Sequence, residues 1–195
     1  MDAMAQALRL ARLCAVSGDV PVGAVVVGPD GTVLGRGWNL REAQADPSAH
    51  AEVVALRQAA AALGRWRLEG CTLVVTLEPC LMCAGALMQA RIARLVFGAW
   101  DPKAGACGSV WDVLRDRQAL HRPEVVSGVR AEASAVLLAD FFRERRVQAG
   151  PGSGAGSGAD DAGGRRFGSA APQDPVAHPP HGGEEPRGQP VDEIR

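Results

Sequence analysis

The sequence predicts an α/β fold of three layers, in which helices cover both faces of a five-stranded mixed sheet. The sequence contains five short runs rich in valine, leucine and isoleucine. From the second run onward, the segments between them have apolar residues at helical spacing. Strands that alternate with helices indicate parallel pairing and coverage on both faces. Only a tight turn separates the first two runs, so that pair is antiparallel and the sheet is mixed.

Local signals set the ends of these elements. Ser48 is suited to cap a helix, Gly64 to end one, and Pro79 to occupy a first helical position. Pro29-Asp30-Gly31 is a turn signal between two strands. In order, we expect a first helix ending at Gly18, strands at 22–27 and 32–38, a polar loop at 39–47, a helix from Ser48 to Gly64, a strand at 71–77, a helix from Pro79 to Met88, a strand at 92–100, a short helix near Asp112, a strand at 124–127 and a final helix at 131–147.

Residues 1–149 form one predicted domain, and residues 150–195 have a different composition. The latter segment contains 11 glycines and 7 prolines in 46 residues, with few large apolar side chains. Such a segment buries too little surface to offset the entropy lost on ordering. We therefore expect a disordered Gly/Pro-rich tail after a domain that is long enough to bury a substantial core.

The predicted domain is nearly neutral, with 17 basic and 15 acidic residues, and the tail adds 4 basic and 7 acidic ones. Bulk charge therefore cannot hold a nucleic acid, and any such binding requires a local basic patch. No apolar run reaches the roughly 18 residues of a membrane-spanning helix, and the first residues lack the pattern of a secretory signal. We expect a cytoplasmic protein without membrane contact.

The five cysteines are an odd number in a chain without a visible secretory signal, which argues against a disulfide framework. Cys14 lies in an apolar helical pattern and Cys71 opens a predicted strand, so we expect both to be buried and inert. Cys80 and Cys83 are three residues apart in a predicted helix and share one face within a single turn. This spacing suits a pair of ligands for one ion.

A second set of chemical groups, His50-Ala51-Glu52, lies near the start of another predicted helix. Two thiolates and an imidazole are three good zinc ligands, and three protein ligands plus a water are the catalytic pattern. We therefore predict a catalytic Zn2+ held by His50, Cys80 and Cys83. Helix N-termini favour thiolates and anions, and zinc lowers the pKa of a bound water towards about 7. Glu52 could reach across the helix end and carry a proton from that water to a substrate nitrogen.

Other interpretations of these residues remain open at this point. The set could form a structural zinc site, and Cys80 with Cys83 could be a redox pair, although a redox motif needs no His-x-Glu partner. Cys107, in a glycine-rich loop, would close the zinc site as a fourth ligand. Glu78 is a competing acid, for which a cap or a hydrogen bond to the backbone is the simpler role.

The motif H-x-E followed by P-C-x-x-C resembles that of the zinc-dependent nucleobase deaminases. Longer stretches resemble the bacterial tRNA-specific adenosine deaminases within the cytidine/deoxycytidylate deaminase superfamily, and they cover about residues 3–147. The chain departs from them at Leu120, where asparagine is frequent, and at Trp111, where a smaller apolar residue is common. The matching stretches are Val20-Pro21-Val22-Gly23-Ala24-Val25, Gly37-Trp38-Asn39, Ala49-His50-Ala51-Glu52, Thr76-Leu77-Glu78-Pro79-Cys80-Leu81-Met82-Cys83-Ala84-Gly85, Arg94-Leu95-Val96-Phe97-Gly98-Ala99, Asp101-Pro102-Lys103-Ala104-Gly105, His121-Arg122 and Phe141-Phe142-Arg143.

This resemblance implies a cytidine-deaminase-like fold and hydrolytic deamination of adenosine to inosine at the wobble position of a tRNA anticodon loop. Hydroxide would attack C6 of adenine and ammonia would leave, with His50, Cys80 and Cys83 as zinc ligands and Glu52 as the proton shuttle. The resemblance also implies a homodimer with tRNA as its partner. The alternatives are a guanine, cytosine or nucleoside deaminase on the same metal site, and a non-catalytic zinc-stabilised RNA-binding module.

The resemblance further implies five substrate contacts. Asn39 would hydrogen-bond the flipped nucleoside, and Asp101 and Lys103 match the family's loop beside the substrate. From the residues alone, a loop-capping asparagine and a solvated turn are the simpler interpretations. Phe142 and Arg145 lie on the last predicted helix, where they could stack on a base and contact phosphates. A charged helix end is the alternative interpretation of the arginines there.

Overall fold

The structure is a computed structural model that describes residues 2–148. The predicted disordered tail at 150–195 and the domain boundary at 149 lie outside the described residues. No helix within the described range is long and apolar enough to cross a membrane.

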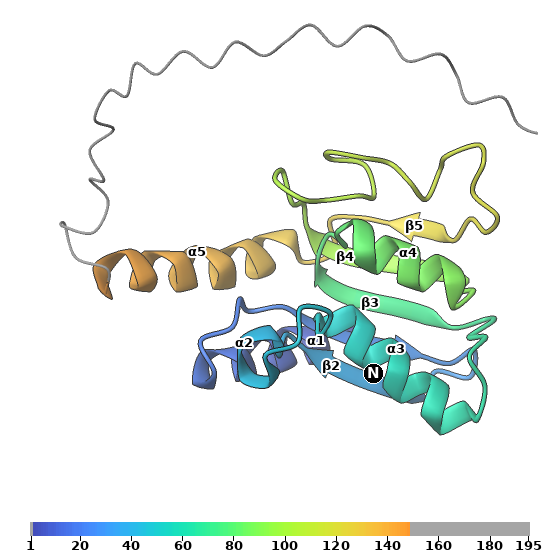
Figure 1. Cartoon of the computed structure of the whole chain (residues 1–195), viewed down its shortest axis with the longest axis horizontal. Coiled ribbons are helices and arrows are strands. Elements are labelled where there is room, and N and C mark those ends of the chain that lie inside the picture. The colour runs from blue at the N-terminus through green and yellow to red at the C-terminus, as the bar shows by residue number, and fades with distance from the viewer. Residues whose placement is uncertain (1, 149–195) are drawn as a thin grey trace, which may run out of the picture. The chain divides into compact units, whose positions relative to one another are not determined.

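Five strands form one mixed sheet in the order β2-β1-β3-β4-β5 (Figure 1). β1 pairs antiparallel with both β2 and β3, whereas β3, β4 and β5 run parallel to one another. This arrangement confirms the predicted five-stranded mixed sheet. The strands are β1 (Gly23–Val27), β2 (Val33–Trp38), β3 (Thr72–Leu77), β4 (Arg94–Ala99) and β5 (Glu124–Val126).

Helices cover both faces of the sheet, which confirms the predicted three layers. α3 and α4 pack on one face, and α1 and α5 pack on the other (Figure 1). Successive residues of a strand point to opposite faces, so β1 and β3 contribute to two separate cores. The helical elements are α1 (Ala3–Ala11), a 3-10 helix (Arg12–Val16), α2 (Arg41–Gln44), α3 (Ala51–Leu63), α4 (Leu81–Gln89) and α5 (Ala131–Gln148).

The two helices with the predicted zinc ligands begin later than the sequence suggested. Ser48 does not cap α3, because its amide and hydroxyl both donate to Asp46 Oδ1 within the preceding turn. His50 is the N-cap residue of α3 instead. Cys80 likewise takes the N-cap position of α4, so Pro79 precedes the helix and is not its first residue. Both corrections place a predicted ligand at a helix end.

Three other expectations were wrong in detail. The predicted short helix near Asp112 is replaced by turns, because Gly108 N–H donates to Trp111 O and Cys107 bridges to Asp112, which closes the segment into a loop. The predicted polar loop at 39–47 contains the one-turn helix α2. The first helix also changes to 3-10 geometry after Ala11.

Two glycines let β2 approach α3 closely. A Cβ on Gly37 would lie 2.1 Å from Ala51 O and 2.7 Å from Ala55 N. A Cβ on Gly35 would meet the next turn of the same helix at similar distances. Because these neighbours are backbone atoms, they cannot move aside without shifting α3. This contact therefore fixes where the first turn of α3 lies.

We expect Gly37→Ala to lower the free energy of unfolding by about 1–3 kcal/mol or more, because the added methyl overpacks the β2–α3 contact. Gly85→Ala is the matched control, since no atom lies within 4 Å of a Cβ at Gly85 inside α4. That change should leave stability unchanged or raise it by up to about 1 kcal/mol. Urea denaturation measures both effects, and equal stability of Gly37→Ala and the parent would contradict the packing argument.

Candidate metal centre and active site

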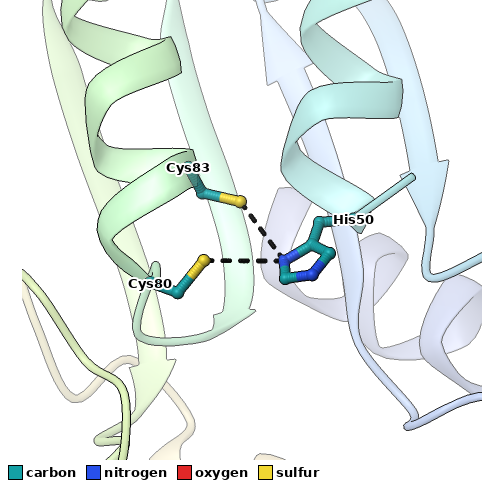
Figure 2. Close-up of side chains that lie close together, drawn as sticks. All are labelled: His50, Cys80 and Cys83. Carbon is teal, nitrogen blue, oxygen red and sulfur yellow. Dashed lines mark hydrogen bonds between the residues drawn. The ribbon is translucent and has the colours of Figure 1, made fainter. Parts of the chain in front are cut away.

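Two helix N-termini meet beside the end of β3, and each carries a potential ligand. His50 is the N-cap of α3, and Cys80, the third residue after β3, is the N-cap of α4. Cys83 lies in the first turn of α4, so its side chain points the same way as that of Cys80 (Figure 2). Neither N-cap residue caps its helix through its side chain, which leaves the imidazole and the thiol available for another partner.

The three donor atoms have the spacing that zinc requires. Nδ1 of His50 lies 3.6 Å from Cys80 Sγ and 3.5 Å from Cys83 Sγ (Figure 2). The three atoms all lie within 4.8 Å of one another. In a tetrahedral zinc site with bonds of about 2.3 Å to sulfur and 2.0–2.1 Å to nitrogen, the sulfur–nitrogen separation is roughly 3.6 Å. The residues present therefore fit Zn2+.

The protonation of the cysteine pair also suits a cation. A hydrogen bond from the Cys83 thiol, aided by the His50 ring, outweighs burial and lowers the pKa of Cys80 to about 4. Donating that hydrogen bond, together with burial, raises the pKa of Cys83. The contact with Cys80 raises the pKa of His50. A bound metal ion would displace the thiol proton, because coordinated thiols are deprotonated.

Cys107 does not join this group of ligands. It is fully buried, and its Sγ lies 3.8 Å from the carbonyl oxygen of Pro79. Among residues 2–148, the cluster that could hold a metal consists of His50, Cys80 and Cys83 alone. The alternative of a site closed by Cys107 is therefore wrong, and the three donors match the catalytic pattern of an ion with one exchangeable position.

Glu52 lies in the first turn of α3 and lines the same cavity as His50. It is only 4% exposed, and burial raises the pKa of its carboxyl group. The His50 ring and the Cys83 thiol act in the opposite direction and lower this pKa, but burial outweighs them. Glu52 is therefore a buried acid next to the metal ligands but outside the ligand set.

The cavity has a volume of about 490 Å³, and most of its surface is formed by apolar atoms. Asn39, which directly follows β2, contributes a polar group to its wall. Its Nδ2 donates to Val20 O over 3.2 Å, while its buried Oδ1 has no hydrogen-bond partner among the described residues. A buried acceptor without a partner is costly unless a ligand satisfies it.

The loop that follows β4 brings Asp101 and Lys103 to the cavity. Oδ1 of Asp101 accepts hydrogen bonds from the backbone N–H groups of Lys103 and Ala104. The carboxylate of Asp101 thus shapes its own turn, while the Lys103 side chain supplies a positive charge at the cavity mouth.

The two predicted contacts on α5 lie in different surroundings. Phe142 lines the cavity and is partly exposed. Arg145 is not among the lining residues. Its guanidinium donates to Gly18 O over 2.6 Å and stacks on the Phe141 ring at 4.8 Å.

Sequence reasoning missed Arg41, which lies on α2 and lines the cavity mouth. The buried Asp19 holds α2 in place by accepting hydrogen bonds from the N–H groups of Glu42 and Ala43. The position of this cation two residues after Asn39 was visible in the sequence. Its place beside the cavity, however, depends on the one-turn helix α2, which the sequence did not predict.

The family model for the cytidine and deoxycytidylate deaminase zinc-binding region matches residues 1–99. The chain belongs to this deaminase family. The match contains His50, Glu52, Cys80 and Cys83, which confirms the predicted family and its zinc dependence.

Individual deaminase relatives cover most of the described domain. The tRNA-specific adenosine deaminase of Bacillus subtilis is 47% identical over 143 residues, which are 73% of this chain and 88% of the relative. A tRNA(Ile)-lysidine synthase of Deinococcus deserti is 54% identical over 144 residues. This chain spans only 27% of that synthase, so the likeness concerns one part of a longer protein.

Solved structures of the deaminase family share the fold. One comes from a study of A-to-I editing by tRNA:A34 deaminases at the wobble position of transfer RNA. It has a TM-score of 0.68 and 45% identity, and it covers 70% of this chain and 98% of that one. The guanine deaminase of Nitrosomonas europaea has a TM-score of 0.61 and 26% identity, covering 72% of this chain and 83% of that one.

Proposed function

We propose that the chain catalyses hydrolytic deamination of adenosine to inosine at the wobble position of a tRNA anticodon loop. One observation carries this proposal: three zinc donors and a buried acid share one cavity, in a chain that covers 88% of the tRNA-specific adenosine deaminase of B. subtilis at 47% identity. The reaction consumes one water and releases one ammonia for each adenosine.

His50, Cys80 and Cys83 would hold the zinc ion. When bound, the ion supplies Lewis-acid activation that lowers the pKa of water into the physiological range. Glu52 handles the proton: it accepts one from the attacking water and passes it to the purine. The departing amino group finally takes up the protons that allow it to leave as ammonia. A buried carboxyl with a raised pKa suits this exchange, because a proton shuttle works best near the operating pH.

The cavity would receive a base that has left its stack. The target carbon is out of reach inside a duplex, so the substrate must be a loop or another single-stranded segment. Asn39 Oδ1, the buried acceptor without a partner, would take a hydrogen bond from the nucleoside. Asp101 lies in the loop on the cavity wall, and Phe142 offers a ring for stacking.

Phosphate contacts would come from a few cations because the domain has little net charge. Lys103 and Arg41 lie at the cavity mouth, and neither takes part in an ion pair within residues 2–148. Arg145 is a further candidate if its contact with Gly18 is exchanged for one to RNA.

We expect Lys103→Ala to weaken binding of an anticodon stem-loop and to reduce the slope of log K against log salt by about 1, because one phosphate contact is lost. Arg94→Ala is the control, since Arg94 begins β4 at the far end from the site and pairs with Glu124. Fluorescence anisotropy at several salt concentrations measures both slopes. Equal slopes for Lys103→Ala and the parent would remove Lys103 from the RNA contacts.

We further propose that the protein works as a homodimer through α3 and α4. An apolar groove lies between these helices, lined in part by Val53, Leu56 and Ala86, and Trp66 at its edge is 60% exposed. Leu81 and Met82 at the start of α4 are also exposed. A second copy of the chain would cover these exposed apolar side chains.

Trp66→Glu should therefore shift the protein from dimer to monomer in sedimentation equilibrium, because it buries a charge in the interface. Val136→Glu is the control: Val136 is 52% exposed but lies on α5, which packs on the opposite face of the sheet. A Trp66→Glu protein that sediments as the parent does would contradict this interface.

The decisive test of the activity is incubation of the purified, zinc-loaded protein with an anticodon stem-loop, a matching perfect duplex, free guanine and cytidine. We expect inosine in the stem-loop and no turnover of the other three. Turnover of guanine alone would favour a base deaminase, and a zinc-loaded protein without any turnover would favour a binding module. Because the proposed substrate is a tRNA, we also propose a cytoplasmic location.

A further inference from the structure

Glu78 is a buried acid that the proposed chemistry does not use. It is 2% exposed and lies between the end of β3 and Pro79, two residues before the first cysteine ligand. None of the ion pairs among residues 2–148 includes it. A buried carboxylate without a cationic partner is costly unless hydrogen bonds satisfy its oxygens.

Both oxygens of Glu78 are satisfied by a single loop, residues 101–109. Oε1 accepts hydrogen bonds from Cys107 N over 2.9 Å and from Ser109 N over 3.1 Å. Oε2 accepts one from Asp101 N over 3.0 Å and contacts Ser109 Oγ at 2.5 Å. The carboxylate therefore joins the two ends of the loop, which has no regular secondary structure of its own.

The loop is built to pack directly against this carboxylate. A Cβ on Gly105 would lie 2.2 Å from both Glu78 Oε2 and Ser109 Oγ, so only glycine fits there. The Ser109 hydroxyl also lies 2.7 Å from Asp101 O, which closes the loop on itself. The same loop carries Asp101 and Lys103 to the wall of the cavity.

We propose that Glu78 is a positioning residue that holds loop 101–109 in place as a wall of the substrate cavity, and thereby sets the affinity for the RNA substrate. This inference rests on the proposed function. Two donors from the loop approach each oxygen, so the carboxylate is occupied by the protein itself. Glu78 is therefore a poor second proton shuttle, whereas Glu52 accepts no donor from this loop.

Two variants perturb the contact from opposite sides. Glu78→Gln replaces one of the two acceptor oxygens with an amide N–H₂ group, which is a donor. At least one donor of the loop therefore loses its partner. Gly105→Ala leaves Glu78 intact but pushes the loop away from it. Ser109→Ala is a milder third variant, because it removes the contacts of the hydroxyl with Glu78 Oε2 and Asp101 O but keeps the three backbone donors to Glu78. Glu42→Gln serves as the control for loss of a carboxylate, since the Glu42 side chain is exposed on α2.

The experiment measures kcat and KM on an anticodon stem-loop, the zinc content, and hydrogen exchange of the amides of Asp101, Cys107 and Ser109. For Glu78→Gln and Gly105→Ala we expect KM to rise about tenfold or more, since hydrogen bonds to a charged group are lost. We expect kcat to change less than about threefold, zinc to remain at one per chain, and the three amides to exchange faster. Ser109→Ala should show the same pattern more weakly, and Glu42→Gln should match the parent.

Three results would overturn the inference. An unchanged KM with faster amide exchange would mean that the loop does not contact the substrate. Loss of zinc from both variants would mean that Glu78 supports the metal helix instead. A fall in kcat at constant KM would assign Glu78 to proton transfer. If the parent protein itself failed to deaminate RNA, the proposed function would fall, and amide exchange would still decide whether Glu78 holds the loop.

Discussion

Glu52→Gln abolishes deamination and leaves zinc in place: this is the expected result with the clearest chemical meaning. The carboxyl group lines the cavity beside the ligands but is not one of them. An amide of the same shape cannot accept and release the proton of water. General acid–base catalysis contributes about 10²–10⁴-fold, so the rate of inosine formation should fall by at least that factor. Metal analysis should still find one zinc per chain.

The control for this variant is Glu42→Gln, which changes an exposed carboxyl group on α2. Only the backbone of Glu42 bonds to Asp19, so its side chain can be changed without loosening α2. The Glu42 variant should keep the activity of the parent. A Glu52→Gln protein that lost its zinc, or that retained near-normal turnover, would contradict the assignment of Glu52 as a proton shuttle.

Cys83→Ala should remove both the metal and the activity. Cys83 is fully buried, and its Sγ is one of the two sulfur atoms within 3.6 Å of His50 Nδ1. With two donors left, the ion is no longer held at ordinary zinc concentrations, and turnover should fall below detection. A ligand that binds only the folded state stabilises it in proportion to the logarithm of one plus the ratio of its free concentration to its Kd, so zinc at 1,000 times its Kd contributes about 4 kcal/mol to stability. The variant should therefore unfold at the lower temperature that the parent shows in a chelator.

The matched control is Cys71→Ala, since Cys71 is also buried but its Sγ faces Glu69 O at 3.9 Å, away from the metal ligands. This control should retain zinc and activity, with a stability loss typical of a small packing defect. Zinc content, thermal unfolding and inosine formation distinguish the two variants. Full zinc occupancy in Cys83→Ala would show that another side chain completes the site.

Much of this fold was predictable because its strongest signals are local. Apolar β-type runs, the Pro29-Asp30-Gly31 turn and the spacing of Cys80 and Cys83 each depend on neighbouring residues. The buried positions of Cys14 and Cys71 were also confirmed. Helix starts were less accurate, because Ser48 had a nearer partner in Asp46 than the free end of α3.

The parts that were missed depend on contacts between distant residues. Asp19 bonds to an α2 turn more than twenty residues away in the chain. Glu78 bonds to amides that are 23 to 31 positions away. Nearly every residue has the same backbone N–H donor, so no pattern in the sequence shows which carboxylate will accept its hydrogen bond. For Glu78, the expected hydrogen bond to the backbone is confirmed, but the sequence did not indicate which amides would donate it.

The close approach of β2 to α3 has a consequence for metal affinity. The imidazole ligand is attached to α3 and both sulfur ligands to α4, so the geometry of the metal site depends on how these two helices are placed. A methyl group at Gly37 would push against the backbone of α3 at Ala51, and would thereby displace the first turn of α3 and the neighbouring His50 ligand. Such a variant should bind zinc less tightly even when it is folded. The chelator concentration that removes zinc therefore reports how accurately α3 and α4 are aligned.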